Sequence, residues 1–302
     1  MSAVDPAAVR IRDAATVMLV RDGADGHSPL EVFMLRRNLN SDFVGGAYVF
    51  PGGAVDEADR HADLEAICEG RSDDQASEML GIDSGGLAYW VAAIRECFEE
   101  AGVLLAYTED GEVVSHVDPD TERRFIDHRR AVDTGEARLI EICEKENLRL
   151  AVDQIHYFSH WITPEGPPRR YDTRFFVTAA PPEQVPLHDD RETIANIWVR
   201  PQDALDRHEK GELDIIFPTI KNLEAIGRFE RSADLLAAAA AIESVPTILP
   251  RIVADGHGMR ILLPGDPGYD EAVPGTLPDT GFPMPGRPGG PTPPPPANQG
   301  SN

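Results

Sequence analysis

Short apolar runs alternate with polar, turn-forming stretches along most of this 302-residue chain. Residues 14–20 and 30–35 are two such runs, and residues 21–26 between them are rich in Asp and Gly. This spacing predicts a pair of antiparallel strands. Further strands are indicated by the apolar runs at residues 48–50, 155–162, 174–179 and 193–199.

Other segments have the spacing of helices. The apolar residues 87–94 predict a helix that continues to Ala101, because Gly102 can end it in a left-handed conformation. Residues 103–105 then resume a strand-like apolar run. More helices are indicated at residues 62–68, 121–148, 201–206, 219–226 and 232–243, with Ser232 as the N-cap of the last.

The end of the helix at residue 87 onward is unusually acidic. Glu96, Glu99 and Glu100 stand at positions i, i+3 and i+4, so they project from one helical face. Arg95 precedes Glu99 by four residues and can hold its carboxylate. Like charges packed so closely need a cation, and hard divalent ions such as Mg²⁺ or Mn²⁺ prefer oxygen ligands. The pattern predicts a metal site, and a solvated glutamate-rich face is the alternative interpretation.

A glycine-rich turn, Phe50-Pro51-Gly52-Gly53, follows the short strand at residues 48–50. Without side chains at the two glycines, backbone carbonyls there can approach an ion or a phosphate closely. The turn is therefore a second candidate part of the same site.

Together the two segments resemble the Nudix hydrolase signature, G-x5-E-x7-R-E-U-x-E-E-x-G-U, where U is a bulky apolar residue. The second half matches from Arg95 to Val103, with Cys97 at a U position. Counted from Gly53, the position that carries Glu in the signature holds Asp59. Asp59 and Arg95 are 36 positions apart instead of 8, so about 28 residues are inserted within the motif.

Gly81 has the uninterrupted spacing to Arg95, but Leu87 then stands where the signature has Glu, so we favour Gly53 and an insertion. A split motif after Phe-Pro-Gly-Gly resembles the coenzyme A diphosphatase branch of the family. Residues 167–176, PPRRYDTRFF, are similar to a strand of that branch. The resemblance covers roughly residues 12–225. It implies an α/β/α sandwich with a mixed sheet, here with helical insertions.

The resemblance implies hydrolysis of a diphosphate, X–P–O–P–Y, with Mg²⁺ or Mn²⁺ as the cofactor. It assigns Arg95 the role of fixing a glutamate by a charge-assisted hydrogen bond. It assigns the metal to Glu96, Glu99, Glu100 and the carbonyl of Gly53. Two general bases stay open: Glu96 within the motif, and Glu192 in the loop before the strand at residue 193.

Four arginines are candidates for binding the substrate. Arg36 and Arg37 precede the loop that leads to the glycine-rich turn. Arg170 and Arg174 flank Asp172, which can instead pair with one of them structurally. The substrate implied first is coenzyme A or an acyl derivative. Two alternatives stay open: a pyrophosphatase acting on ADP-ribose, NADH or a nucleotide sugar, and a non-catalytic nucleotide-binding regulator with a Nudix fold.

The net charge, the apolar runs and the cysteines indicate which binding partners and which cellular location to expect. A net charge of −24 repels nucleic acid and acidic membrane surfaces, whereas bound cations still allow a small phosphate-bearing substrate. With no run of 18 apolar residues and no secretory pattern at the N-terminus, we expect no membrane partner and a cytoplasmic location. Three scattered cysteines indicate reduced thiols. The family resemblance also allows a homodimer.

The chain divides by composition into three parts. We expect a Nudix domain over residues 1–245, with insertions at about 60–86 and 119–150. Residues 246–274 are expected to add a small hairpin that turns at Asp255-Gly256-His257-Gly258. Residues 275–302 are rich in Pro and Gly and are expected to be disordered.

Overall fold

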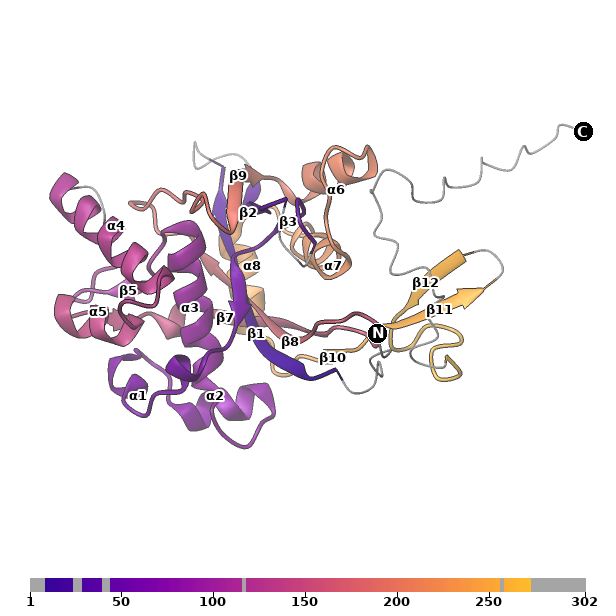
Figure 1. The fold of residues 1–302 in the computed structure, drawn as a ribbon, viewed down its shortest axis with the longest axis horizontal. Coiled ribbons are helices and arrows are strands. Elements are labelled where there is room, and N and C mark those ends of the chain that lie inside the picture. Colours follow the sequence, from indigo (N-terminus) through magenta and orange to yellow (C-terminus); the bar gives the residue numbers. More distant parts are fainter. Residues whose placement is uncertain (1–8, 24–28, 40–43, 116–117, 256–257, 273–302) are drawn as a thin grey trace, which may run out of the picture.

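The strand-like runs assemble into one eight-stranded mixed sheet (Figure 1). The computed structural model describes residues 9–23, 29–39, 44–115, 118–255 and 258–272. Strands β1 (Ile11–Asp22) and β2 (Leu30–Arg37) pair antiparallel, as the first two apolar runs predict.

Strand β1 lies at the centre of the sheet. Along its length it pairs in parallel with β8 (Arg170–Ala179), from Ile11 opposite Arg170 to Val20 opposite Ala179. Strand β7 (His156–Ile162) runs antiparallel to β8, and β10 (Thr247–Ile248) extends that edge. Strand β9 (Thr193–Val199) runs antiparallel to β2.

The glycine-rich turn crosses between two strands of this sheet. Strand β3 (Tyr48–Val49) pairs with β2, and β4 (Gly52–Ala54) pairs with β1. Phe50 and Pro51 connect them, so the two glycines lie against the middle of β1. The turn is thereby held by backbone hydrogen bonds on a rigid element.

Side chains of β1 alternate between two cores, one on each face of the sheet. Ala15, Val17 and Leu19 join the core under α3 (Leu87–Ala101), whereas Met18 and Val20 join the opposite core. The opposite core is covered by α6 (Pro201–Glu209), α7 (Phe217–Ile226) and α8 (Ser232–Ala240). This is the expected α/β/α sandwich.

The insertion within the motif packs onto the α3 side. It contains the 3-10 turn η2 (Glu57–Arg60), α1 (Leu64–Ile67) and α2 (Asp73–Leu80). Helix α2 was not predicted, although its sequence carries a recognisable start and stop. Ser72 and Gln75 form a capping box, and Gly81 ends the helix in the left-handed region.

The second insertion forms α4 (Pro119–Asp133) and α5 (Leu139–Glu146) beside α3 (Figure 1). Short strands β5 (Ala106–Tyr107) and β6 (Arg149–Leu150) and the 3-10 turn η3 (Val152–Gln154) join these helices to the body of the domain.

Two local predictions were wrong. The apolar residues 103–105 are buried but form no strand, because the side chain of Gln184 takes the backbone N–H and C=O of Leu104. Ser232 is the first residue of α8 rather than its cap. Arg231 occupies the cap position, and the Asp22 carboxylate accepts the Ser232 N–H.

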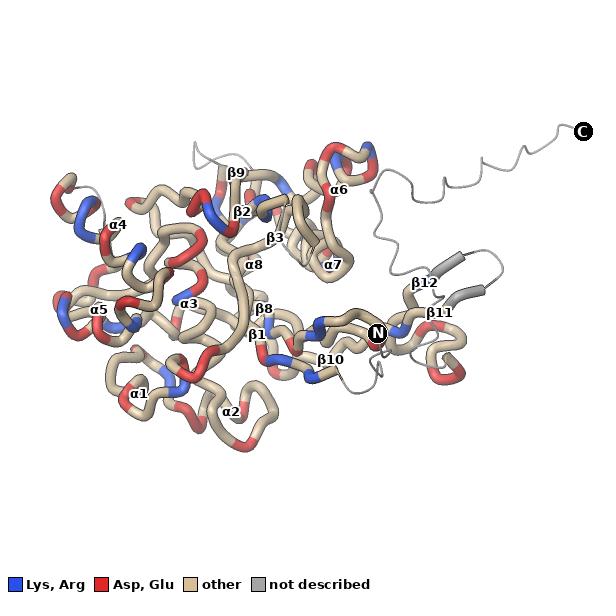
Figure 2. Tube along the Cα trace, in the orientation of Figure 1, with Lys and Arg blue, Asp and Glu red and all other residues tan. Residues whose placement is uncertain are grey.

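Near the C-terminus, β11 (Arg251–Asp255) and β12 (Gly258–Leu262) form an antiparallel pair. The expected turn residues 256–257 and the expected disordered tail, 275–302, lie outside the described residues. No helix in the described part of the chain is long and apolar enough to span a bilayer. Figure 2 shows acidic positions spread over both helical layers.

Candidate active site

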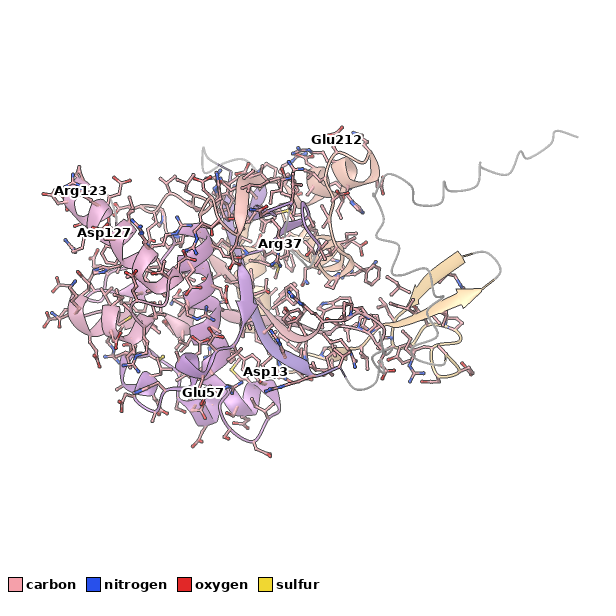
Figure 3. All side chains as sticks on the ribbon, viewed as in Figure 1. Asp13, Arg37, Glu57, Arg123, Asp127 and Glu212 are labelled. Atoms are coloured by element: carbon pink, nitrogen blue, oxygen red, sulfur yellow. The ribbon has the colours of Figure 1, made fainter. Side chains whose placement is uncertain are left out.

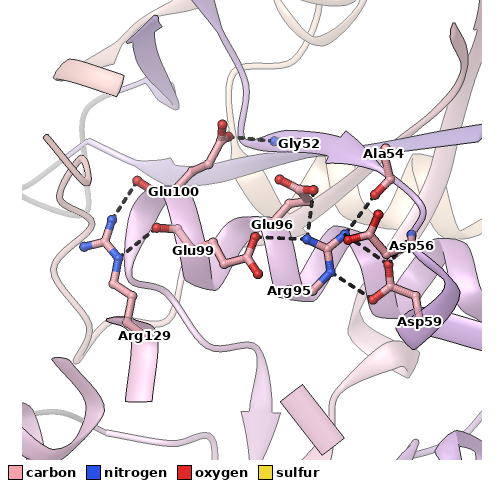
Figure 4. Close-up of polar contacts among 9 residues, drawn as sticks. All are labelled: Gly52, Ala54, Asp56, Asp59, Arg95, Glu96, Glu99, Glu100 and Arg129. Carbon is pink, nitrogen blue, oxygen red and sulfur yellow. Dashed lines mark hydrogen bonds and ion pairs between the residues drawn. The ribbon is translucent and has the colours of Figure 1, made fainter. Parts of the chain in front are cut away.

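The guanidinium of Arg95 is the centre of the acidic motif (Figure 4). Arg95 is buried on α3 and donates from Nη1 to Oε1 of Glu96 and to Oε2 of Glu99, at 2.9 Å each. Its Nε and Nη2 donate to the two carboxylate oxygens of Asp59, at 2.9 and 3.0 Å. Nη2 also donates to the carbonyl of Ala54 at 2.8 Å. One side chain therefore holds three carboxylates and the strand β4 in a fixed arrangement.

Asp59 brings the two halves of the split motif together. It lies on η2, only 2% exposed, at the position where the signature has Glu. Its Oδ2 also accepts the backbone N–H of Asp56 at 2.8 Å. A bidentate pair with Arg95 combines charge with fixed geometry. The inserted residues thus leave the motif intact in space.

The two glycines of the turn are required for close approach rather than for an unusual φ angle, since neither has a positive φ. The N–H of Gly52 donates to Oε2 of Glu100 at 2.9 Å. A Cβ atom on Gly53 would lie 2.4 Å from Oε1 of Glu96. By contrast, a Cβ on Gly81 would meet nothing within 4 Å. Gly53, and not Gly81, is the glycine placed against the α3 carboxylates.

These carboxylates are harder to ionise than free glutamates. Burial raises the pKa of Glu96 and of Glu100, and burial raises that of Glu99 to about 7 despite the opposing charge of Arg95. Burial also raises the pKa of Asp59. Loss of hydration on burial is the largest cause of each rise, and neighbouring carboxylates add to it at all three glutamates.

The donor set fits a divalent cation. Among the described residues, no group of three or more His, Cys, Asp or Glu side chains already has the arrangement of a metal site. Glu96 and Glu99 accept hydrogen bonds from Arg95, and Glu100 accepts one from Gly52, so the predicted convergence of all three is not seen. The oxygen atoms of these carboxylates are nevertheless the type of ligand that Mg²⁺ and Mn²⁺ prefer.

Arg37 and Glu192 lie within electrostatic reach of Glu100. Burial contributes most to the raised pKa of Glu100. The positive charge of Arg37 lowers this pKa, and the negative charge of Glu192 raises it further. In the view of Figure 3, the label of Arg37 lies near the middle and that of Glu212 near the edge. Arg36 donates from Nε to the carbonyl of Gly46 at 3.3 Å. The predicted roles of these three residues in binding and proton transfer stay predictions.

Arg170 and Arg174 are buried in the sheet and have partners of their own. Arg170 donates from Nε to the carbonyl of Thr163 at 3.0 Å. Arg174 forms an ion pair with Asp172 and lies over the ring of Tyr89, 4.8 Å from its centre. Neither has a described contact with the α3 carboxylates, so phosphate binding by them stays a prediction.

A cavity of about 240 Å³ adjoins the acidic network. On one side it is lined by Asp59, Arg95 and Glu99. On the other it is lined mainly by apolar side chains from the insertions, including Leu64 and Ile140. The insertions therefore form part of the wall around the candidate active site.

The sequence interpretation missed Arg129, on α4. This arginine donates to the backbone carbonyls of Glu99 and Glu100 at the end of α3 (Figure 4). Its position in a charged helix gives no signal of this, because its partners are backbone atoms whose proximity depends on the fold.

Comparisons with known proteins agree with this geometry. A family model described as the NUDT19 Nudix domain matches residues 71–226. Acyl-coenzyme A diphosphatase NUDT19 from Gallus gallus is 29% identical over 86% of this chain and 80% of its own length. The protein of the same name from Homo sapiens is 27% identical over 89% of this chain and 83% of its own.

A crystal structure of a Nudix hydrolase from Alicyclobacillus acidocaldarius superposes with a TM-score of 0.63. It is 26% identical and covers 79% of this chain and 99% of the other. With the α/β/α sandwich and the reassembled acidic motif, these matches define a Nudix hydrolase, an enzyme that cleaves phosphoanhydride bonds. Within that class, the chain belongs to the family of the NUDT19 Nudix domain.

Proposed function

We propose that this enzyme hydrolyses the diphosphate bond of coenzyme A or an acyl derivative with Mg²⁺ or Mn²⁺. The names and the coverage of the Gallus gallus and Homo sapiens relatives support this substrate class. The observation that carries the catalytic part is the network of Arg95 with Asp59, Glu96 and Glu99, which reassembles the split motif.

Glu96, Glu99, Glu100 and the carbonyl of Gly53 would hold the ion. When bound, the ion supplies charge neutralisation for the diphosphate and a more acidic water. Arg95 fixes the orientation of Glu96 and Glu99. Glu96, which lies within the motif beside the glycine-rich turn, is one candidate for accepting the proton of the attacking water. Glu192, close to Glu100, is the second candidate.

The phosphates need cations outside the carboxylate cluster. Arg37, which acts electrostatically on Glu100, is the arginine best placed to contact them, and Arg36 adjoins it. Arg170 and Arg174 would contribute only if their present partners were exchanged for phosphate. The cavity beside Glu99 offers room next to the carboxylates.

Replacing Glu99 or Glu100 by Gln tests the proposal. Each change removes one negative charge and little volume, so we expect kcat to fall about 100-fold or more because the ion is held less well. Turnover is to be measured with Mg²⁺ and with Mn²⁺ on coenzyme A, acetyl-coenzyme A, ADP-ribose, NADH and a nucleotide sugar. Glu192→Gln in the same panel distinguishes the two bases.

Glu122→Gln is the matched control, since Glu122 is exposed on α4 and distant in sequence from the motif. It should behave as wild type. Faster turnover of ADP-ribose than of coenzyme A would overturn the substrate assignment, whereas full activity in both α3 variants would overturn the assignment of the carboxylates. The homodimer and the cytoplasmic location stay predictions, to be checked by sedimentation velocity and cell fractionation.

A further inference from the structure

The carboxyl end of α3 has a partner for each of its last four backbone carbonyls. The last four carbonyls of a helix receive no hydrogen bond from an N–H group inside the helix, so they need donors from elsewhere. Phe98 accepts the N–H of Gly102, and Ala101 accepts the N–H of Leu187 at 2.9 Å. The two carbonyls between them belong to Glu99 and Glu100, whose side chains are proposed to hold the ion. Both are taken by one arginine from α4.

Arg129 makes these contacts with a single planar group. Its Nε donates to the carbonyl of Glu99 and its Nη2 to that of Glu100, at 2.9 Å each. Nη2 also donates to the carbonyl of Leu187 at 3.0 Å. Gly102 leaves room for the group, because a Cβ there would lie 3.0 Å from Nη1 of Arg129. A cation at this end of a helix also complements the helix dipole.

Helix α4 also contacts the loop that leads to Glu192, through the Arg129 bond to Leu187 and through a second residue. Asp133, one turn after Arg129 on α4, forms an ion pair with Arg191. Within the loop, the Asp189 carboxylate accepts the N–H groups of Glu192 and Thr193, at 3.0 and 2.8 Å. Helix α4 therefore joins the end of α3 to this loop from outside the sandwich.

We propose that Arg129 is a positioning residue for hydrolysis. It holds the end of α3 and the loop from Leu187 to Glu192 in one register, and so fixes how the backbones that carry Glu99, Glu100 and Glu192 lie relative to one another. This inference rests on the proposed roles of those three glutamates, and it gives the second insertion a part in catalysis. Since its partners are backbone atoms, Arg129 acts without touching the substrate.

Arg129→Met removes the donors and keeps most of the apolar stem, and Arg129→Lys keeps the charge without the planar fork. We expect kcat to fall and the Kd for Mn²⁺ to rise, each about 10- to 100-fold, as for other groups that orient metal ligands. Mn²⁺ binding is to be measured by electron paramagnetic resonance on the full chain without substrate. KM should change less than kcat. Arg130→Met, an exposed neighbour on α4, is the matched control and should match wild type.

Circular dichroism and thermal unfolding separate positioning from stability alone. A folded Arg129→Met or Arg129→Lys protein with wild-type kcat and wild-type Mn²⁺ affinity would overturn the inference, even if its Tm were lower. Should the Met variant fail to fold, the Lys variant alone decides. Turnover is compared on coenzyme A, or on ADP-ribose if coenzyme A is not cleaved, so an incorrect substrate leaves the test intact. Unchanged Mn²⁺ binding and turnover in the Glu99 and Glu100 variants would instead reject the proposed carboxylate roles.

Discussion

A side chain on Gly53 would occupy the place of the Glu96 carboxylate. The three atoms nearest to such a Cβ all belong to Glu96, at 2.4 to 2.7 Å. Because they are the far end of a flexible side chain, they can move without disturbing the sheet. At the residue scale, the glycine therefore controls the position of the Glu96 carboxylate more than the stability of the fold.

Gly53→Ala should lower kcat about 10- to 100-fold, because displacement of a reacting group by about 1 Å is enough for such a loss. The free energy of unfolding should change little. Turnover and urea unfolding of the same preparation provide the two measurements.

Gly81→Ala is the contrasting variant. Gly81 has a φ of +67° and open space around it, so alanine there should destabilise the protein by about 1–2 kcal/mol through backbone strain and leave kcat unchanged. A Gly53→Ala protein that keeps full activity, or a Gly81→Ala protein that loses it, would reject this division of roles.

At the scale of elements, the segment after α3 shows how a side chain can replace a strand. Leu104 is fully buried, yet its N–H and C=O bond to the amide of Gln184, 80 residues later. The same amide donates to the carbonyl of Val114 at 2.9 Å. Gln184 is thus a buried connection between its own loop, the segment that follows α3 and the segment around Val114.

Gln184→Leu should reduce the free energy of unfolding by about 2–3 kcal/mol, because it leaves buried backbone groups without partners. Urea unfolding followed by circular dichroism measures the change. Gln202→Leu, at an exposed position on α6, should stay within about 0.5 kcal/mol of wild type. Equal stabilities for the two variants would show that the Gln184 contacts contribute nothing.

The elements with a local signal were predictable. Helix α3 follows from its apolar run and from Gly102, and the spacing of Glu96, Glu99 and Glu100 follows from helical geometry alone. Contacts between distant residues carry no such signal. The family pattern placed Asp59 within the motif but did not predict its pairing with Arg95. Gln184 and Arg129 recognise backbone groups that any sequence possesses.

At the scale of the whole molecule, negative charge is spread over the surface and is also concentrated in the buried carboxylates of α3. The chain carries a net charge of −24, and acidic positions are scattered over both helical layers (Figure 2). The buried carboxylates of α3 add a local surplus. Self-repulsion and buried acid both disfavour the folded state as carboxyls ionise.

The metal-free protein should therefore lose stability as pH rises. Burial raises the pKa of Glu99 from 4.5 to about 7, so the folded state binds its proton more tightly than the unfolded chain does. The free energy of unfolding should fall across this window. Mn²⁺ requires ionised ligands, so the rise in Tm on adding it should be larger at pH 8 than at pH 6. Thermal unfolding with EDTA or with Mn²⁺ gives both quantities.

Glu99→Gln should show a shallower dependence on pH, whereas Glu122→Gln should not. Carboxyls whose pKa is lowered affect the free energy of unfolding only at a pH below this window. Glu141 is an example, because the hydrogen bond from the Arg138 N–H lowers its pKa from 4.5. Stability that increases between pH 5 and pH 7 without metal, or an Mn²⁺ effect independent of pH, would contradict the assignment.

The parallel pairing of β1 with β8 has a consequence for biosynthesis. Ile11 faces Arg170, so about 160 residues separate the two central strands of the sheet. At typical rates of translation, β8 leaves the ribosome on the order of ten to thirty seconds after β1. Throughout that interval the backbone N–H and C=O groups on one edge of β1 lack their native partners. Such an edge can pair with other chains, so we expect the nascent chain to need chaperones.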